Sequence, residues 1–165
     1  MIHIAYKHYE ALRAHGEETY PHECCGVLLG SIDRTTLSLT TIVRSVEQGP
    51  SVEVTRPAEL KVVEQLRALP NVHEEGHERR YLIAPEEMFK LEREARAGGL
   101  KILGFYHSHP DHPARPSIYD RDWAWPWYTY IIVAVAKGEP QQMTVWTLDE
   151  DRQEFVEERR VDRIA

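Results

Sequence analysis

The sequence has almost no cysteine and no long hydrophobic run. Its two cysteines, Cys24 and Cys25, are adjacent, so they offer no disulfide framework, and a reducing compartment is the default expectation. No stretch approaches the ~20 apolar residues that cross a bilayer, and His3, Lys7 and His8 interrupt any apolar signal segment at the N-terminus. We therefore predict a cytoplasmic protein that has no membrane partner.

Positive charge is also in short supply. Lysine and arginine number 20 against 27 aspartate and glutamate residues, for a net charge of −7. Such a surface repels phosphate backbones and anionic lipid, so we expect no nucleic-acid partner. The hydrophobic fraction of 42% and charged fraction of 28% are ordinary for a folded chain. At 165 residues, the whole of 1–165 is expected to form one domain.

Strands and helices are expected to alternate along the first two thirds of the chain. Apolar patterns predict strands at 2–5, 25–30, 37–46, 101–107, 128–135, 143–148 and 154–159, and helices at 6–15, 58–69 and 85–97. Gly16 is expected to end the first helix, and the polar stretch 70–80 is expected to be a surface loop. This order predicts an α/β fold in which helices cover a mixed β-sheet.

Two motifs compete as metal sites. The first, His73-Glu74-Glu75-Gly76-His77, fits the H-E-x-x-H pattern of zinc proteases, which works only on a helix. Its surroundings are polar and contain Gly76 with Pro70 just upstream, so a solvated loop is the better interpretation. A chain of this composition is expected to contain about 0.06 such matches by chance.

The second motif joins His107, His109, Ser117 and Asp120, and composition would give only about 0.0007 matches. His107 and His109 close an apolar strand, where residues two apart point to the same face. Ser117 is expected to open a short helix that turns Asp120 back towards them. Two histidines and a carboxylate leave a fourth tetrahedral position for water, as in catalytic zinc sites. Ser117 and Asp120 also fit a simple helix cap, and the two interpretations are compatible.

These residues resemble the signature of the JAMM (MPN-plus) metalloprotease family, in its compact bacterial and archaeal form. The family also places a glutamate before a Cys-Gly and an apolar strand, and residues 21–30 match that element with Glu23. The resemblance implies a cytidine-deaminase-like α/β fold, a mixed sheet sandwiched by helices in one domain. True deaminases would need H-x-E and P-C-x-x-C, and neither occurs.

The resemblance also implies a function. One Zn²⁺ per chain would be held by His107, His109 and Asp120, Glu23 would act as general base, and Ser117 would stabilise the oxyanion. The substrate would be the peptide or isopeptide bond after the C-terminal Gly-Gly of a ubiquitin-like or sulfur-carrier protein. Two alternatives stay open: hydrolysis of a cysteine or small-amide adduct on a sulfur carrier, and a non-catalytic MPN scaffold.

Several other residues receive weaker predictions. Trp123, Trp125 and Trp127 recur at every second position and could line a groove for an extended tail, but packing in the core or at an edge is favoured. Asp111, in the loop between the ligands, is expected to lie in a solvated turn. At least one of the two cysteines is expected to be a small core residue.

Overall fold

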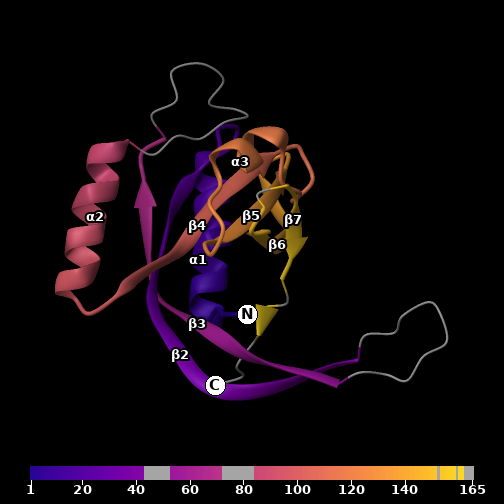
Figure 1. The fold of residues 1–165 in the computed structure, drawn as a ribbon. Coiled ribbons are helices and arrows are strands. Elements are labelled where there is room, and N and C mark those ends of the chain that lie inside the picture. Colours follow the sequence, from indigo (N-terminus) through magenta and orange to yellow (C-terminus); the bar gives the residue numbers. More distant parts are fainter. Residues whose placement is uncertain (43–52, 72–83, 152, 159, 162–165) are drawn as a thin grey trace.

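The computed structural model describes residues 1–42, 53–71, 84–151, 153–158 and 160–161. They form one curled β-sheet with helices packed on it (Figure 1). In chain order the elements are β1 (Ile2–His3), α1 (Tyr6–Thr19), β2 (Cys25–Ile42), β3 (Glu53–Leu69), α2 (Pro85–Ala97), β4 (Lys101–Pro110), α3 (Ile118–Trp123), β5 (Thr129–Ala136), β6 (Glu139–Leu148), β7 (Phe155–Glu157) and β8 (Arg160–Val161).

The sheet has eight strands in the order β7-β6-β5-β4-β2-β3-β1-β8. The pairs β4–β5, β1–β3 and β1–β8 are parallel, and the other pairs are antiparallel. The parallel connection from β4 to β5 passes through α3, which therefore lies beside the end of β4. The predicted α/β class with a mixed sheet is confirmed.

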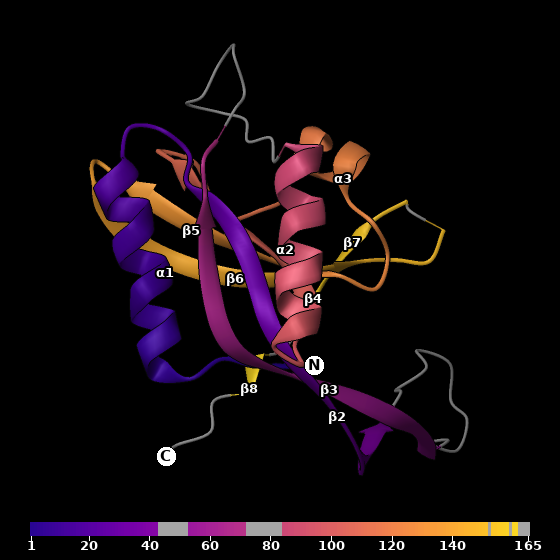
Figure 2. The same ribbon diagram turned by 90° about the vertical axis from the view of Figure 1, so that its left-hand side faces the viewer.

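Helices α1 and α2 pack on opposite faces of this sheet (Figure 2). On the α1 face, Leu12 is fully buried against Leu28 and Ile131. On the α2 face, Leu91 packs with Val27 of β2. Because successive strand residues point to opposite faces, the apolar run of β2 is buried on both sides. Among the described residues, no helix is both long and apolar enough to cross a bilayer.

The helix predicted at 58–69 is wrong, because these residues belong to β3. The pairing of β3 with β2 shifts register at Glu64. Such a β-bulge adds one residue to the strand and changes the phase of its alternation. Val63 and Leu66 therefore pack on the same core although they are three residues apart. The three-residue spacing of Val63 and Leu66, which resembles that of a helix face, comes from a strand with a bulge.

Two strand and helix boundaries also differ from the prediction. The strand expected at 25–30 and the described part of the strand expected at 37–46 form one continuous β2, with an irregularity in its pairing between Asp33 and Leu37. Helix α1 continues through Gly16 to Thr19. An added Cβ at Gly16 would lie 3.0 Å from a methyl of Val135, so this glycine allows the helix to approach the sheet.

Lys61 of β3 is buried beneath Trp127, which lies two residues before β5 begins. Its ammonium group donates hydrogen bonds to the carbonyl oxygen of Trp127 and, at 3.1 Å, to the Thr129 hydroxyl. It also lies 4.5 Å from the centre of the Trp127 ring, a cation–π contact. Trp127 has a φ of 80°, a strained value for a bulky residue. Burial lowers the pKa of Lys61 to about 8.

Replacing Lys61 with methionine should lower the free energy of unfolding by about 2 kcal/mol. The stem would stay packed, but the Trp127 carbonyl and Thr129 hydroxyl would lose their donor in a buried position. Denaturant unfolding followed by tryptophan fluorescence would measure the change. Lys90→Met on the exposed side of α2 is the matched control, expected to stay within about 0.5 kcal/mol of wild type. Equal stability of both variants would contradict the assignment.

Candidate metal centre

The two histidines of the second motif lie at the carboxyl end of β4, next to α3 (Figure 1). Strand geometry directs His107 and His109 to the same face, and both are buried, with 1% and 8% of their surfaces exposed. Their Nε2 atoms are 2.9 Å apart. Nδ1 of His109 lies 2.8 Å from the carbonyl oxygen of Pro113. A proton on Nδ1 would be held by that carbonyl, which leaves the Nε2 lone pair directed at the site.

Asp120 reaches the same point from α3. Ser117 is the N-cap of this helix, and its hydroxyl accepts a hydrogen bond from the Asp120 amide at 3.2 Å. In return, the Ser117 amide donates to Asp120 Oδ2 at 2.5 Å. This reciprocal capping box fixes the carboxylate at the first turn. The helix cap is therefore present, and the same geometry is compatible with Asp120 as a metal ligand.

The three side chains converge closely enough to hold one ion. His107 Nε2 lies 3.0 Å from Asp120 Oδ1, and His109 Nε2 lies 3.7 Å from Asp120 Oδ2. All three candidate ligand atoms lie within 4.8 Å of one another. Ligand atoms around a tetrahedral Zn²⁺ at 2.0–2.1 Å are separated by about 3.3–3.4 Å, and the spacings here bracket that value. Donor type, geometry and burial fit a zinc ion.

The electrostatics of the three residues suit a cation. Burial alone would raise the pKa of Asp120, but its contacts with His107, His109 and Ser117 hold that pKa well below the usual range. Burial lowers the pKa of His107, against the opposing influence of Asp120. Burial also disfavours the charged form of His109, but hydrogen bonds with Asp120 and Pro113 leave its pKa raised. The carboxylate thus carries a negative charge into a buried site.

Glu23 lies beside the histidines, just before β2 begins. Cys25 pairs with His107, and the Ser108 amide donates to the Cys24 carbonyl oxygen at 3.1 Å, so antiparallel pairing places Glu23 level with His109. The side chain is only 6% exposed. Its pKa is raised to about 8, chiefly by burial; the charge of Asp120 contributes to the rise, while His109 opposes it. A positive charge at the convergence point would favour the carboxylate form.

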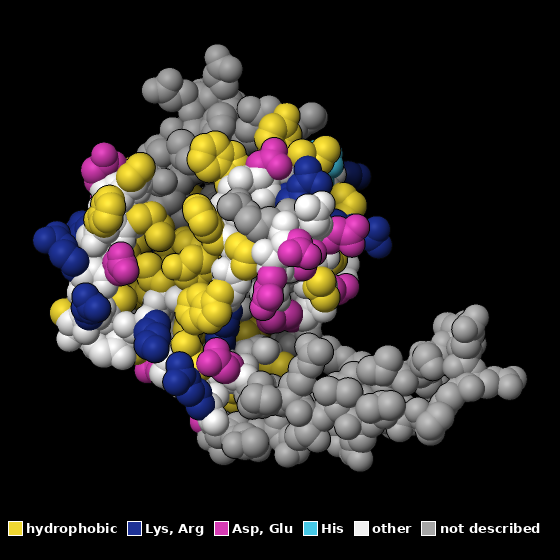
Figure 3. Space-filling model, in the orientation of Figure 1, with side chains coloured by type: hydrophobic (Ala, Val, Ile, Leu, Met, Phe, Trp, Pro, Cys, Tyr) yellow, Lys and Arg dark blue, Asp and Glu magenta, His cyan; other side chains and the backbone are white. Residues whose placement is uncertain are grey.

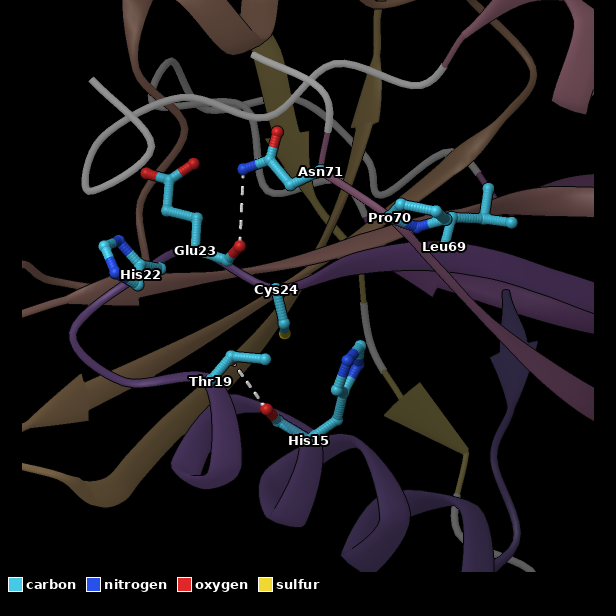
Figure 4. A pocket seen from close by; sticks show the side chains of 8 residues that line it. All are labelled: His15, Thr19, His22, Glu23, Cys24, Leu69, Pro70 and Asn71. Atoms are coloured by element: carbon cyan, nitrogen blue, oxygen red, sulfur yellow. Dashed lines mark hydrogen bonds between the residues drawn. The ribbon is translucent and has the colours of Figure 1, made fainter. Parts of the chain in front are cut away.

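A pocket of about 410 Å³ adjoins this site and is lined by Glu23 and Cys24 together with residues of α1 and of the end of β3. Figure 4 shows that the Glu23 side chain and the Cys24 thiol point in opposite directions from the chain, with Cys24 directed towards His15 and Thr19 of α1. The Asn71 amide group donates to the Glu23 carbonyl oxygen at 3.3 Å. Glu23 therefore borders both this pocket and the histidine pair, whereas the Cys24 thiol faces α1.

Two other sequence predictions can be compared with the structure. Both cysteines are buried free thiols, as expected for core residues. The favoured packing of the tryptophans is wrong, since Trp123, Trp125 and Trp127 are 73%, 60% and 44% exposed. Trp123 is the last residue of α3, and Trp125 and Trp127 follow this helix. The H-E-x-x-H motif at 73–77 lies outside the described residues.

Sequence reasoning missed the contacts that support the ligands. Its view of Asp111 as solvated was incomplete, because both carboxylate oxygens accept hydrogen bonds. The Cys24 amide donates to the Ser108 hydroxyl at 2.8 Å, which ties the Glu23 segment to the strand between the two histidines. The only signal for Asp111 was its place directly after the His-Pro pair, where an aspartate can adopt a left-handed turn.

Comparison with known proteins identifies the family of the chain. Residues 6–149 match the family described as prokaryotic homologs of the JAB domain. The chain is 31% identical over 136 residues to a desampylase of Haloferax volcanii, covering 81% of this chain and 76% of that protein. A solution structure of a Salinibacter ruber protein has 33% identity and a TM-score of 0.65, covering 99% of this chain and 92% of the other.

Two further solved structures share the fold. A Desulfitobacterium hafniense protein has 26% identity and a TM-score of 0.70, covering 99% of this chain and 93% of the other. A JAB1/MPN domain protein from Archaeoglobus fulgidus, at 19% identity, has a TM-score of 0.52 and covers 98% of this chain and 99% of its own. The chain belongs to the prokaryotic branch of the JAB/MPN (JAMM) family.

Proposed function

We propose that the protein is a zinc-dependent peptidase that cleaves the bond after the C-terminal Gly-Gly of a ubiquitin-like protein, sulfur carriers included. The observation that carries this proposal is the convergence of His107, His109 and Asp120 with Glu23 beside them. Family membership and the similarity to a desampylase support a ubiquitin-like substrate. A non-catalytic scaffold would have no need of a buried glutamate next to a three-ligand group.

Each residue would have a distinct role in hydrolysis. Zinc held by the two histidines and Asp120 would lower the pKa of water towards ~7 and polarise the scissile carbonyl. Glu23 accepts the proton of the attacking water and transfers it to the leaving amine. The Ser117 hydroxyl, which accepts from the Asp120 amide, keeps its own proton to donate to the carbonyl oxygen as negative charge develops there.

The surface next to the site supports a protein substrate. Hydrophobic side chains gather between α2 and the segment that follows α3 (Figure 3). Phe89 of α2, Trp125 and Trp127 are 70%, 60% and 44% exposed. Contiguous apolar surface of this kind is typical of interaction sites. A substrate that offered only a small amide would leave this surface uncovered.

The proposal can be tested by incubating zinc-loaded protein with a panel of ubiquitin-like fusions, with and without chelator, and weighing the products. We expect a product that ends in Gly-Gly, lost on chelation and restored when zinc is added back. A matched fusion that carries valine in place of the last glycine should resist cleavage. Stoichiometric zinc binding without cleavage would favour a scaffold, and release of only a small amine from a sulfur carrier would favour the adduct hydrolase.

A further inference from the structure

A hydrogen bond joins the two chain segments that carry Glu23 and the histidine pair. Tyr20 lies three residues before Glu23, and Asp111 lies two residues after His109. The Tyr20 hydroxyl donates to Asp111 Oδ2 at 2.8 Å. The two residues are 91 positions apart in the chain, so their contact is a long-range tertiary contact next to the site.

Asp111 is itself held in place by two backbone hydrogen bonds. Its other carboxylate oxygen, Oδ1, accepts a hydrogen bond from the Lys137 amide at 2.8 Å. Its own amide donates to the Val135 carbonyl oxygen at 2.7 Å. With a φ of 54°, Asp111 adopts the left-handed conformation, which aspartate tolerates better than most residues. The carboxylate is therefore fixed to the connection between β5 and β6.

Through its hydrogen bond with Asp111, Tyr20 restrains the segment that carries Glu23. Its ring packs against the hydrophobic core on the α1 face, and it directly follows the last residue of α1. Residues 20–24 lie in no helix or strand. On the β2 side of Glu23, the segment is held by the paired hydrogen bonds between Cys24 and Ser108. On the α1 side of Glu23, the side chain of Tyr20 ties the segment to Asp111, directly after β4.

We propose that the Tyr20–Asp111 hydrogen bond is a positioning contact that fixes Glu23 against His107, His109 and Asp120. This inference rests on the proposed function, in which Glu23 moves protons at the reacting atoms. A proton carrier must lie within hydrogen-bond reach of its partner, and a misplacement of ~1 Å can cost ~10²-fold in rate. Neither Tyr20 nor Asp111 needs to touch the substrate.

Tyr20→Phe tests the contact because it removes one hydroxyl and keeps the packed ring. We expect kcat to fall about fivefold, the equivalent of one net hydrogen bond, with KM and zinc affinity within about twofold of wild type. Asp111→Asn should retain most of the activity, since an amide can accept from Lys137 and donate to Tyr20 while keeping the left-handed turn. Tyr6→Phe, at the exposed start of α1, is the matched control.

Two further readouts separate positioning from general stability. In a Glu23→Gln background, Tyr20→Phe should cause no further loss of the residual rate, because the group it positions is gone. Amide hydrogen exchange at residues 22–24 should be faster in Tyr20→Phe than in wild type and should stay slow in Asp111→Asn. The exchange measurement does not depend on any substrate.

The outcomes distinguish this inference from the proposed function. Unchanged exchange at residues 22–24 in Tyr20→Phe would overturn the positioning contact whether or not the protein cleaves a fusion. Faster exchange with an unchanged kcat would overturn it as well. If wild type binds zinc but cleaves nothing, the proposed function fails, while faster exchange in Tyr20→Phe would still support the contact.

Discussion

Glu23→Gln is expected to bind zinc as wild type does and to lose about 10³-fold in kcat. General acid–base catalysis contributes ~10²–10⁴-fold, and glutamine cannot accept the proton of the attacking water. The fold should be retained, because the site already disfavours the charged form and raises the pKa of Glu23 to about 8. Single-turnover cleavage of a fusion and metal analysis of the purified protein would measure the two properties.

The control for this variant is Glu17→Gln, which makes the same chemical change on the exposed side of α1. It should cleave at the wild-type rate. Normal turnover by Glu23→Gln would remove Glu23 from the mechanism. Loss of zinc from Glu23→Gln would instead indicate that this glutamate supports the ligands.

Asp120→Asn is expected to weaken zinc binding by more than ~100-fold and to abolish cleavage at sub-stoichiometric zinc. Loss of residues that only support metal ligands costs ~10–100-fold, so loss of a ligand charge should cost more. The amide oxygen of asparagine can still accept from the Ser117 amide, which keeps the helix cap. Competition with a chromophoric chelator would measure the affinity.

Asp122→Asn is the matched control for this second variant. Asp122 lies on the same helix, has 57% of its side chain exposed and contacts Arg121 at 3.6 Å. Its replacement should leave zinc affinity unchanged. Equal affinity of the Asp120 and Asp122 variants would show that the carboxylate of α3 is not a ligand.

Local signals predicted the fold correctly where several of them agree. Helix α2 occupies residues 85–97 as expected, because a proline at its first turn, acidic residues near its start and two glycines at its end all favour the same boundaries. Strand β3 was mistaken for a helix because the bulge at Glu64 depends on pairing with β2. No local pattern reveals a register shift that a neighbouring strand imposes.

In the candidate site, too, local properties could be predicted from the sequence and long-range pairing could not. The spacing of His107 and His109 on a strand and the Ser117–Asp120 cap are local properties, so the sequence could predict that these side chains converge. Glu23 lies beside His109 because β2 pairs with β4. In the sequence, only the family resemblance indicated this position. The contact of Tyr20 with Asp111 depends on tertiary structure alone.

The origin of the ligands in one short stretch has a consequence for how the protein assembles. His107, His109 and Asp120 all come from residues 107–120, so bringing them together closes a small loop with a low entropic cost. Glu23 arrives from the far side of a long-range contact, the kind that forms slowly during folding. We therefore expect the three candidate ligands to converge before Glu23 joins them, so that the site is complete only when the N-terminal segment docks on β4.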